Sequence, residues 1–541
     1  MMTLIKKFYF ISLPILTFLV YFALLSANKT VNPDAQIIFE HLNNVKGAFD
    51  YLIKIAQLQT IDFQPIRDIT LFLDIFFFEH FDLNTSISQN LLWWIGSCYF
   101  IWKIQKVIFS DKNKSLIFLL LLAFAVYPLF SFTISWGMAR KHIVSFFFII
   151  FATYEIVSPK CFTIRRSLKI SALYLLSGFA QPIHILWPIW ASIYLKFNSK
   201  MKWRELLKIV APLFLAFTFL TIINFLYYKY SPTYNFHYAS KTSEIFNLSD
   251  KVLALGHYHF QLFFPFLLSF NYELGDYHVL VGLLILVIFT LILYKRSTKL
   301  EVLFWLVPGY LSLVVILNTP HHLFDSYLLL PGFSLLMLIS HLLPQKINGT
   351  SKIGFSLLIL LFSLFSHFES KKWLDPVTLT QSSFENRQNC KNALNFLKMT
   401  YESHLNVSEN LRNYLTKYDC LKDQNSTHYK AISNVVLISY ILFHEDALPI
   451  QDRINRLKFL SQKSLIAHLS LAALYLKNSK TYEADMVIED IVKLMKDKKI
   501  SGKEFHPITA YYVHPYCKKK NWEECLTITS KLSQKPKNPY L

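Results

Sequence analysis

Long apolar runs separated by short polar loops dominate the first two thirds of the chain. The first run, from Phe8 to Leu25, follows Lys6 and Lys7 and has no small-residue cleavage site, so we expect a retained helix and not a removed signal peptide. Further runs predict spanning helices at roughly 89–105, 115–131, 143–157, 168–180, 183–197, 207–227, 278–295, 302–317, 327–343 and 353–367. The pattern predicts an all-α, polytopic membrane domain of about eleven transmembrane helices in residues 1–367, with 256–270 partly buried or re-entrant.

From about Phe368 the apolar runs stop, and the sequence becomes charged and rich in Asn and Lys. We expect a separate soluble helical domain over residues 368–541. The stretch from Ser464 to Met495 fits one tetratricopeptide (TPR) unit, with Ala472 and Ala484 at the small positions of its two helices. Because such repeats bury their faces against neighbours, we expect three or four helix pairs, and an unrelated helical bundle is the alternative.

Basic clusters in the short loops predict the orientation of the chain. They occur at Lys6/Lys7, Lys103/Lys106/Lys112/Lys114, Arg165/Arg166/Lys169, Lys200/Lys202/Arg204, Lys295/Arg296/Lys299 and Lys346/Lys352. All fall on the side of the N-terminus if the helices alternate, and the positive-inside rule makes that side cytoplasmic. An odd number of spans then exports the loops 28–88, 132–142, 228–277 and 318–326, together with the whole C-terminal domain.

The composition is typical of a membrane protein and argues against a nucleic-acid-binding protein. The 541 residues are 53% hydrophobic and 16% aromatic, and the mean hydropathy is +0.33. The net charge of +20 lies largely in inter-helix loops, so we exclude nucleic acid as a partner. Of the six cysteines, Cys390, Cys420, Cys517 and Cys525 lie in the exported tail, where disulfides are permitted. Spacing alone does not fix their connectivity, so a Cys390–Cys420 disulfide and a Cys517–Cys525 disulfide remain open alternatives.

The exported loop 28–88 carries several carboxylates and one amphipathic segment. Ile69, Phe72, Leu73 and Phe76 recur at helical spacing, so residues 67–78 predict an interfacial helix with a buried apolar face. The acidic residues of the loop would then lie near the mouth of a pocket.

Four motifs follow one another between residues 32 and 331. They are FQPIRDITLFLD with SQNLLWW, which holds Pro65, Asp74 and Asn90; AFAVYPLFSFTISWGMARKHIVS, which holds Pro128, Leu129, Trp136, Arg140 and Lys141; LLSGFAQPIHILWP; and FDSYLLLP. Together they resemble the GT-C glycosyltransferases of the transmembrane-and-TPR-repeat O-mannosyltransferase group and their bacterial relatives. The resemblance implies a bacterial inner-membrane enzyme that uses a polyprenyl-phosphate-linked sugar, with a cytoplasmic N-terminus and a periplasmic TPR-like domain.

The chain departs from this family at its charged positions. No carboxylate precedes Asn32 and Pro33 where the family has an acidic pair, and the family's loop Glu aligns with Phe132. Tyr127, Phe130, His142, Gln181 and Ser326 replace two His, an Asp, a Lys and an Arg. An inverting transfer needs a base near the acceptor hydroxyl. Asp34 is the nearest carboxylate that could replace the missing base, and Asp62 and Asp68 are the next candidates. We therefore take these three as the candidate catalytic residues.

The short loop at residues 132–142 supplies the candidate substrate contacts. Arg140 and Lys141 suit a lipid phosphate, His142 titrates near neutral pH, and Trp136 lies beside them. The alternative for the two cations is anchoring at the headgroups, and for His142 a helix-end position. Cations or a divalent metal would stabilise the departing phosphate, and the sequence identifies no certain cofactor.

A second polar cluster occurs in NTPHHLFDSY. The adjacent His321 and His322 cannot both reach one metal from a helix face, so we predict no metal ligands there. Asp325 and Tyr327, at the head of a predicted span, are further candidate substrate-binding residues, because an ionisable group at that depth has a partner or a role.

Two functions therefore remain open. The first is a membrane glycosyltransferase that moves a sugar from a polyprenyl-phosphate donor to an exported protein or an envelope glycan. The second is a catalytically degenerate relative that binds lipid-linked substrate, or an assembly partner that holds another protein through its TPR-like tail. A transporter is weaker, because the predicted spans lack charged midplane residues and paired broken helices.

Overall fold

The computed structural model is all-helical in the part of the chain that it describes. That part comprises residues 2–26, 63–71, 85–159, 162–198, 202–230, 248–269, 277–296, 300–317, 325–343, 349–402, 408–418 and 450–461, with isolated positions besides. The chain divides into two compact units, Met1–Arg387 and Gln388–Leu541.

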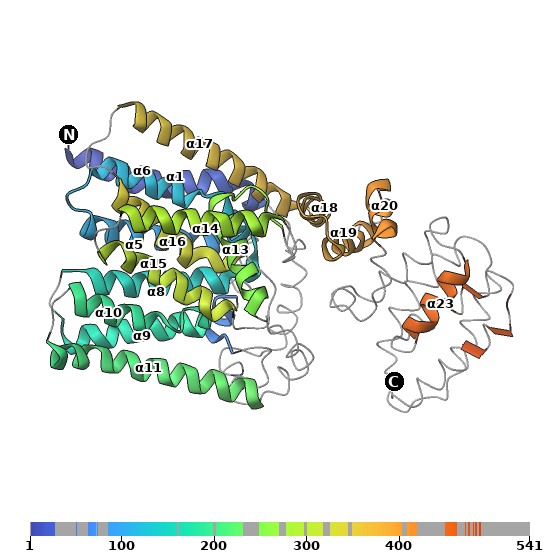
Figure 1. Ribbon diagram of the computed structural model, residues 1–541, viewed down its shortest axis with the longest axis horizontal. Coiled ribbons are helices and arrows are strands. Elements are labelled where there is room, and N and C mark those ends of the chain that lie inside the picture. Colours follow the sequence, from blue (N-terminus) through green and yellow to red (C-terminus); the bar gives the residue numbers. More distant parts are fainter. Residues whose placement is uncertain are drawn as a thin grey trace. The chain divides into compact units, whose positions relative to one another are not determined.

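The first unit is a bundle whose helices run side by side (Figure 1). Its elements are α1 (Met2–Tyr21), η1 (Phe22–Ser26), α5 (Thr85–Ile108), α6 (Lys114–Ala125), α7 (Pro128–Ser135), η3 (Gly137–Ala139), α8 (Arg140–Val157), α9 (Ile164–Ala180), η4 (Pro182–His184), α10 (Trp187–Asn198), α11 (Trp203–Tyr230), α13 (Leu248–Phe263), α14 (Tyr277–Arg296), α15 (Leu300–Leu317), η6 (Asp325–Leu328), α16 (Leu329–Leu342), α17 (Gly349–Lys371), η7 (Lys372–Leu374) and α18 (Pro376–Asn386). Large side chains such as Trp94, Trp187 and Trp190 are fully buried in its core.

Several of these helices are long and apolar enough to cross a membrane. Among the described residues these are Trp203–Tyr227, Asp325–Leu342 and Lys352–Leu374, and a bent pair made of α6 and α7 raises the number from three to four. Every predicted span overlaps one of the helices of the first unit. The chain is therefore a membrane-associated helical protein, and eleven crossings remain a prediction.

The predicted span 115–131 is two helices. α6 ends at Ala125, α7 begins at Pro128, and the two helices are bent by 50°. A proline has no N–H and clashes with the preceding turn, but it suits the first position of a new helix. The break turns α7 aside and leads through Trp136 and η3 to the start of α8.

Contacts between helices fix their relative directions. Trp93 meets Phe148 at 5.8 Å and Phe100 meets Phe151 at 4.1 Å, so α5 and α8 run in the same direction. α9 runs opposite to α8, because Ser145 meets Ser177 near one end, whereas Glu155 meets Lys169 toward the other. The starts of α5 and α8 and the end of α9 thus lie at one end of the unit, which we name the site end.

The other end gathers basic side chains. Lys112, between α5 and α6, donates to the carbonyl of Leu343 at 2.7 Å, just after α16. Glu155 is buried between Lys169, at 2.8 Å, and Arg166, at 3.8 Å. We name this the opposite end.

The second unit begins later than the sequence suggested. The first unit extends to residue 387, beyond the expected boundary at 367, because α18 packs on it. Ser383 meets Ser269 at 2.7 Å, and Asn386 donates to the carbonyl of Leu268 at 2.9 Å. The described helices of the second unit are α19 (Cys390–Glu402), α20 (Glu409–Lys417) and α23 (Ile450–Ser461). Cys390 is disulfide-bonded, and most of the predicted TPR unit lies outside the described residues.

Candidate functional site

Arg140 is the centre of a buried polar network at the site end. It is the first residue of α8 and is fully buried. Its Nε donates to Oδ1 of Asn90 at 2.9 Å, and its Nη1 donates to the carbonyl of Thr70 at 3.1 Å. A buried guanidinium is stable only when it has hydrogen-bond partners. These two bonds therefore explain how the first residue of α8 can be a buried arginine. Arg140 is therefore not an exposed headgroup anchor.

Asn90 joins the start of α5 to the turn before α8. Its Nδ2 donates to the carbonyls of Ile134 at 3.0 Å and Trp136 at 3.3 Å, while its Oδ1 accepts from Arg140. A carboxamide can donate from its nitrogen and accept at its oxygen, so one residue fixes both the backbone turn and the guanidinium.

The segment 63–71 brings a buried ion pair into the same network. Arg67 and Asp68 are both nearly inaccessible, and Arg67 Nε lies 2.6 Å from Asp68 Oδ1. Arg67 Nη1 also donates to Oε1 of Gln64 at 2.8 Å. Gln64 in turn donates to Oε1 of Gln181 at 2.6 Å, at the end of α9. The segment 63–71 is thus tied to α8 and to the end of α9 by polar bonds.

The two sides of this segment meet different surroundings. Arg67, Asp68 and Thr70 are buried, whereas Ile69 and Leu73 are 43% and 42% exposed. The polar side faces the protein, and part of the predicted apolar face points outward.

η6 supplies the second cluster of candidate residues. Asp325 and Tyr327 are buried, and the Tyr327 ring meets His142 edge-to-face with centroids 5.2 Å apart. His142 is itself buried on the first turn of α8, one residue beyond the half-buried Lys141. Trp136 is half-buried and packs on Phe132 at 6.1 Å.

The network unites some of the predicted site residues. Arg140 links α8 to the segment that holds Asp68, and His142 links α8 to the η6 segment that holds Asp325 and Tyr327. Asp34 and Asp62 lie outside the described residues. Within the described ranges, no group of three or more His, Cys, Asp or Glu side chains is placed to hold a metal ion.

Four contributors were not among the predicted site residues: Gln64, Arg67, Asn90 and Gln181. All four occur in the recognised motifs, and that position was the available signal for them. Their pairing is not marked locally, because Gln64 and its partner Gln181 are 117 residues apart.

An apolar groove opens beside this network. Its empty volume, open mouth included, is about 790 Å³, and it is lined by side chains that include Phe124, Tyr127, Phe130, Leu336, Leu358 and Phe362. Gly332 forms part of its wall, where a Cβ would lie 2.6 Å from Cζ of Phe130. α7 lines the groove with Phe130 and bonds Asn90 through the carbonyl of Ile134, and the η6–α16 segment lines it with Leu336 and meets His142 through Tyr327, so the same elements contribute to both features.

Comparison of the chain with protein-family models, with curated proteins and with solved structures finds no match.

Proposed function

We propose that the first unit is a GT-C-like membrane glycosyltransferase that transfers a sugar from a polyprenyl-phosphate donor to an exported acceptor. The observation that carries this proposal is the buried convergence of Asp68, Arg67 and Arg140 at one end of a membrane-associated bundle, beside a lateral apolar groove. Such a pairing of charged groups with an apolar groove fits a ligand that has a phosphate at the end of a hydrocarbon chain.

The chemistry requires a base and a stabilised leaving group. Asp68 would take the proton from the acceptor hydroxyl, whose oxygen attacks the anomeric carbon of the donor sugar while polyprenyl phosphate leaves with the bonding electrons. Arg140 and Arg67 would stabilise the charge of the departing phosphate. The neighbouring guanidinium of Arg67 favours the ionised form of Asp68, which a base requires.

The groove would hold the isoprenoid chain. Its walls are mainly aliphatic and aromatic, and each buried methylene contributes about 0.8 kcal/mol. α7 runs from the groove at Phe130 to the polar network at Trp136, so the phosphate of a bound lipid would approach Arg140.

Two observations support an exported site. Basic side chains such as Lys112, Arg166 and Lys169 lie at the opposite end, and positive charge favours the cytoplasmic side. Cys390 follows the first unit and is disulfide-bonded, as export permits. We therefore propose a bacterial inner-membrane location with the second unit in the periplasm.

The assay for this function is release of polyprenyl phosphate by the full chain in lipid nanodiscs. Radiolabelled polyprenyl-phosphate mannose and polyprenyl-phosphate glucose serve as donors, with a membrane extract as acceptor source. We expect release above a protein-free blank, and Asp68→Asn should lower it by about 100-fold or more. Asp111→Asn, an exposed carboxylate at the opposite end, is the matched control and should leave the rate unchanged. Equal rates in Asp68→Asn and the unsubstituted protein would rule out Asp68 as the base.

A binder without transfer activity is the second candidate. It is favoured by the short Arg67–Asp68 contact, which occupies an oxygen that a base would use. This function predicts binding of undecaprenyl phosphate that Arg140→Ala weakens about tenfold to 100-fold, since bonds to charged groups contribute about 1.5–3 kcal/mol. It also predicts no release from any donor, which separates it from the transferase.

A further inference from the structure

The start of α11 carries exposed basic side chains. Lys202, Arg204 and Lys208 are exposed, and none of them forms an ion pair within the described residues. Glu205 is the one carboxylate in the sequence from 202 to 208, and it is exposed as well. This segment therefore presents an excess of positive charge on the surface of the first unit.

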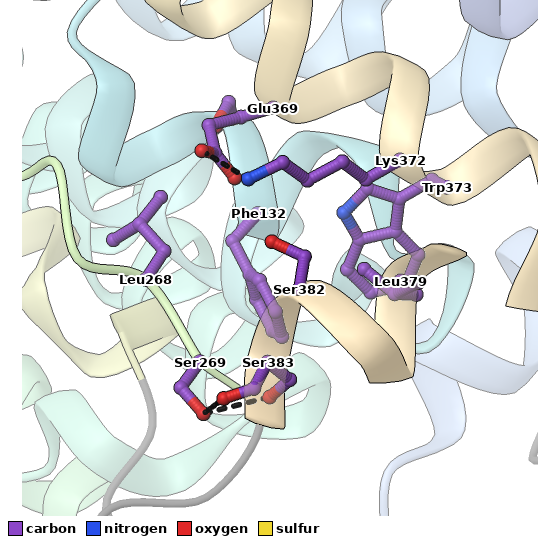
Figure 2. Close-up of a pocket in the computed structure, with 10 residues that line it drawn as sticks. Phe132, Leu268, Ser269, Glu369, Lys372, Trp373, Leu379, Ser382 and Ser383 are labelled. Atoms are coloured by element: carbon purple, nitrogen blue, oxygen red, sulfur yellow. Dashed lines mark hydrogen bonds and ion pairs between the residues drawn. The ribbon is translucent and has the colours of Figure 1, made fainter. Parts of the chain in front are cut away.

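Other cations of the first unit have a carboxylate beside them. In the close-up of Figure 2, Nζ of Lys372 points at Glu369, 2.6 Å from its Oε1. Nζ of Lys169 likewise lies 2.8 Å from Oε1 of Glu155. The cations at the start of α11 have no such partner in the described part of the chain, so an anion from outside the protein would be stabilised there.

α11 begins at the opposite end of the unit, because it runs in the same direction as α9. The hydroxyl of Ser167, early in α9, donates to the carbonyl of Ile209, early in α11. Gly178, late in α9, packs against Leu220 farther along α11. Since α9 ends at the site end, the basic side chains lie at the end where the other loop cations gather. In Figure 1, α11 forms one edge of the bundle and α17 the other.

The face of α11 that carries the cations continues as an apolar row. Arg204 and Lys208 are one turn apart and both exposed. The row continues at helical spacing with side chains that are 44–71% exposed, namely Leu215, Phe219, Ile222 and Leu226. The helix is also long and apolar enough to cross a membrane. One face thus joins positive charge at its start to a hydrocarbon-facing row along its length.

Trp203 marks the level of the membrane surface. Its ring is 64% exposed, and Nζ of Lys196, near the end of α10, lies 4.3 Å from its centroid. An exposed indole favours the boundary between hydrocarbon and headgroups. The neighbouring cations are therefore at the depth of lipid phosphates.

We propose that the start of α11 binds the headgroup of an anionic phospholipid, whose acyl chains lie along the exposed apolar row. A headgroup with a net negative charge fits, because three cations outnumber one carboxylate here, whereas a zwitterionic lipid brings its own cation to the phosphate. A soluble acidic partner would complement the charges and leave the apolar row uncovered. The proposal does not depend on the transferase function.

The test is native mass spectrometry of the full chain in neutral detergent, titrated with dioleoylphosphatidylglycerol or dioleoylphosphatidylcholine. We expect the anionic lipid to bind more tightly. Arg204→Gln and Lys208→Gln should each weaken its binding about threefold to tenfold, in line with the attraction of a single basic residue to an anionic headgroup. The charge-preserving pair Arg204→Lys and Lys208→Arg should retain the affinity. Lys352→Gln, an exposed cation near the start of α17, is the matched control and should leave the affinity unchanged.

Equal affinities for the two lipids would overturn the proposal, as would equal affinities in Arg204→Gln, Lys208→Gln and the unsubstituted protein. A loss in Lys352→Gln as large as that in Arg204→Gln would also overturn it, because the binding would then not be local to α11. Displacement of the bound lipid by excess inorganic phosphate or by a polyglutamate peptide would overturn it in favour of a soluble anion or an acidic protein. Either single variant of α11 decides the matter if the other does not fold.

Discussion

At the residue scale, Arg140 shows how a single buried cation can join distant parts of a membrane protein. It binds Asn90, 50 residues away, and Thr70, 70 residues away. The sequence offered Arg140 as either a phosphate ligand or a headgroup anchor, since a cation at the end of an apolar run suits both roles. Its burial excludes exposed anchoring, and no local pattern carries that information.

Arg140→Lys should destabilise the protein. Arg140 donates from two different nitrogens of its guanidinium, whereas a lysine has a single ammonium nitrogen. The substitution therefore leaves either Asn90 Oδ1 or the Thr70 carbonyl buried without its donor. The expected loss is about 1–3 kcal/mol, measured as a lower midpoint of thermal unfolding in detergent. Arg165→Lys, at an exposed position, is the control and should change little. Equal midpoints for the two variants would contradict the network.

At the element scale, periodicity identified which residues share a face and left open which face meets the protein. Residues 67–78 read as a helix with a buried apolar side, but the described part buries Arg67, Asp68 and Thr70. In a membrane protein, apolar side chains can face the lipid as well as the protein core. A hydrophobic face therefore does not show which side of a helix packs on the protein. The break before Pro128 was similarly hidden inside a continuous apolar run.

The crossing of α13 and α14 depends on two glycines. A Cβ on Gly282 would lie 1.8 Å from the carbonyl oxygen of Gly256, which is backbone and cannot move aside. Gly282→Ala should therefore cost about 1–3 kcal/mol through overpacking. Gly354→Ala on α17 is the matched control, because nothing lies within 4 Å of its Cβ position, and it should be neutral or stabilising. Equal thermal midpoints for both variants would contradict this packing.

α18 depends on the cap at its N-terminus. The Asp375 side chain accepts from the backbone N–H groups of Val377, at 3.2 Å, and Thr378, at 2.9 Å, and from the Thr378 hydroxyl. Partial burial raises the pKa of Asp375, but these hydrogen bonds outweigh it and hold the pKa below its ordinary value. The cap is then fully effective above the unfolded pKa, near 4, and is lost as pH falls through the lowered folded value.

Asp375→Ala should lower stability by about 1 kcal/mol at neutral pH. Its thermal midpoint should approach that of the unsubstituted protein as the pH falls from about 4 through the lowered folded pKa, because the native cap becomes protonated there. Glu385→Ala, an exposed residue of the same helix, controls for loss of a carboxylate. A difference between Asp375→Ala and the unsubstituted protein that does not shrink in acid would contradict the cap.

At the scale of the whole molecule, the helical class and the positions of the apolar segments could be predicted from the sequence. Length and hydropathy are local properties, so each predicted span meets a helix. The boundary between the units could not be predicted, since the attachment of α18 depends on Ser269 and Leu268, far from it in sequence. The same holds for the site, where Arg140 was identified by motif, whereas its bonds to Asn90 and Thr70 join residues far apart in the sequence and could not be predicted.

The orientation of the molecule is testable with reporters. Loops at the opposite end should lie in the cytoplasm, and the site end and second unit outside it. A phosphatase fused after residue 387 should be active, because it folds only when exported, and one fused after residue 112 should be inactive. The reverse pattern would place the candidate site in the cytoplasm and remove the proposed access to exported acceptors.

The glycan profile of the cell envelope tests the central claim most directly. Cells that produce the unsubstituted protein, Asp68→Asn or Asp111→Asn at equal levels are compared with cells that lack the protein. The account predicts a glycan species that is present with the unsubstituted protein and with Asp111→Asn, and that is lost both with Asp68→Asn and without the protein. An envelope profile that is the same in all four strains would contradict it.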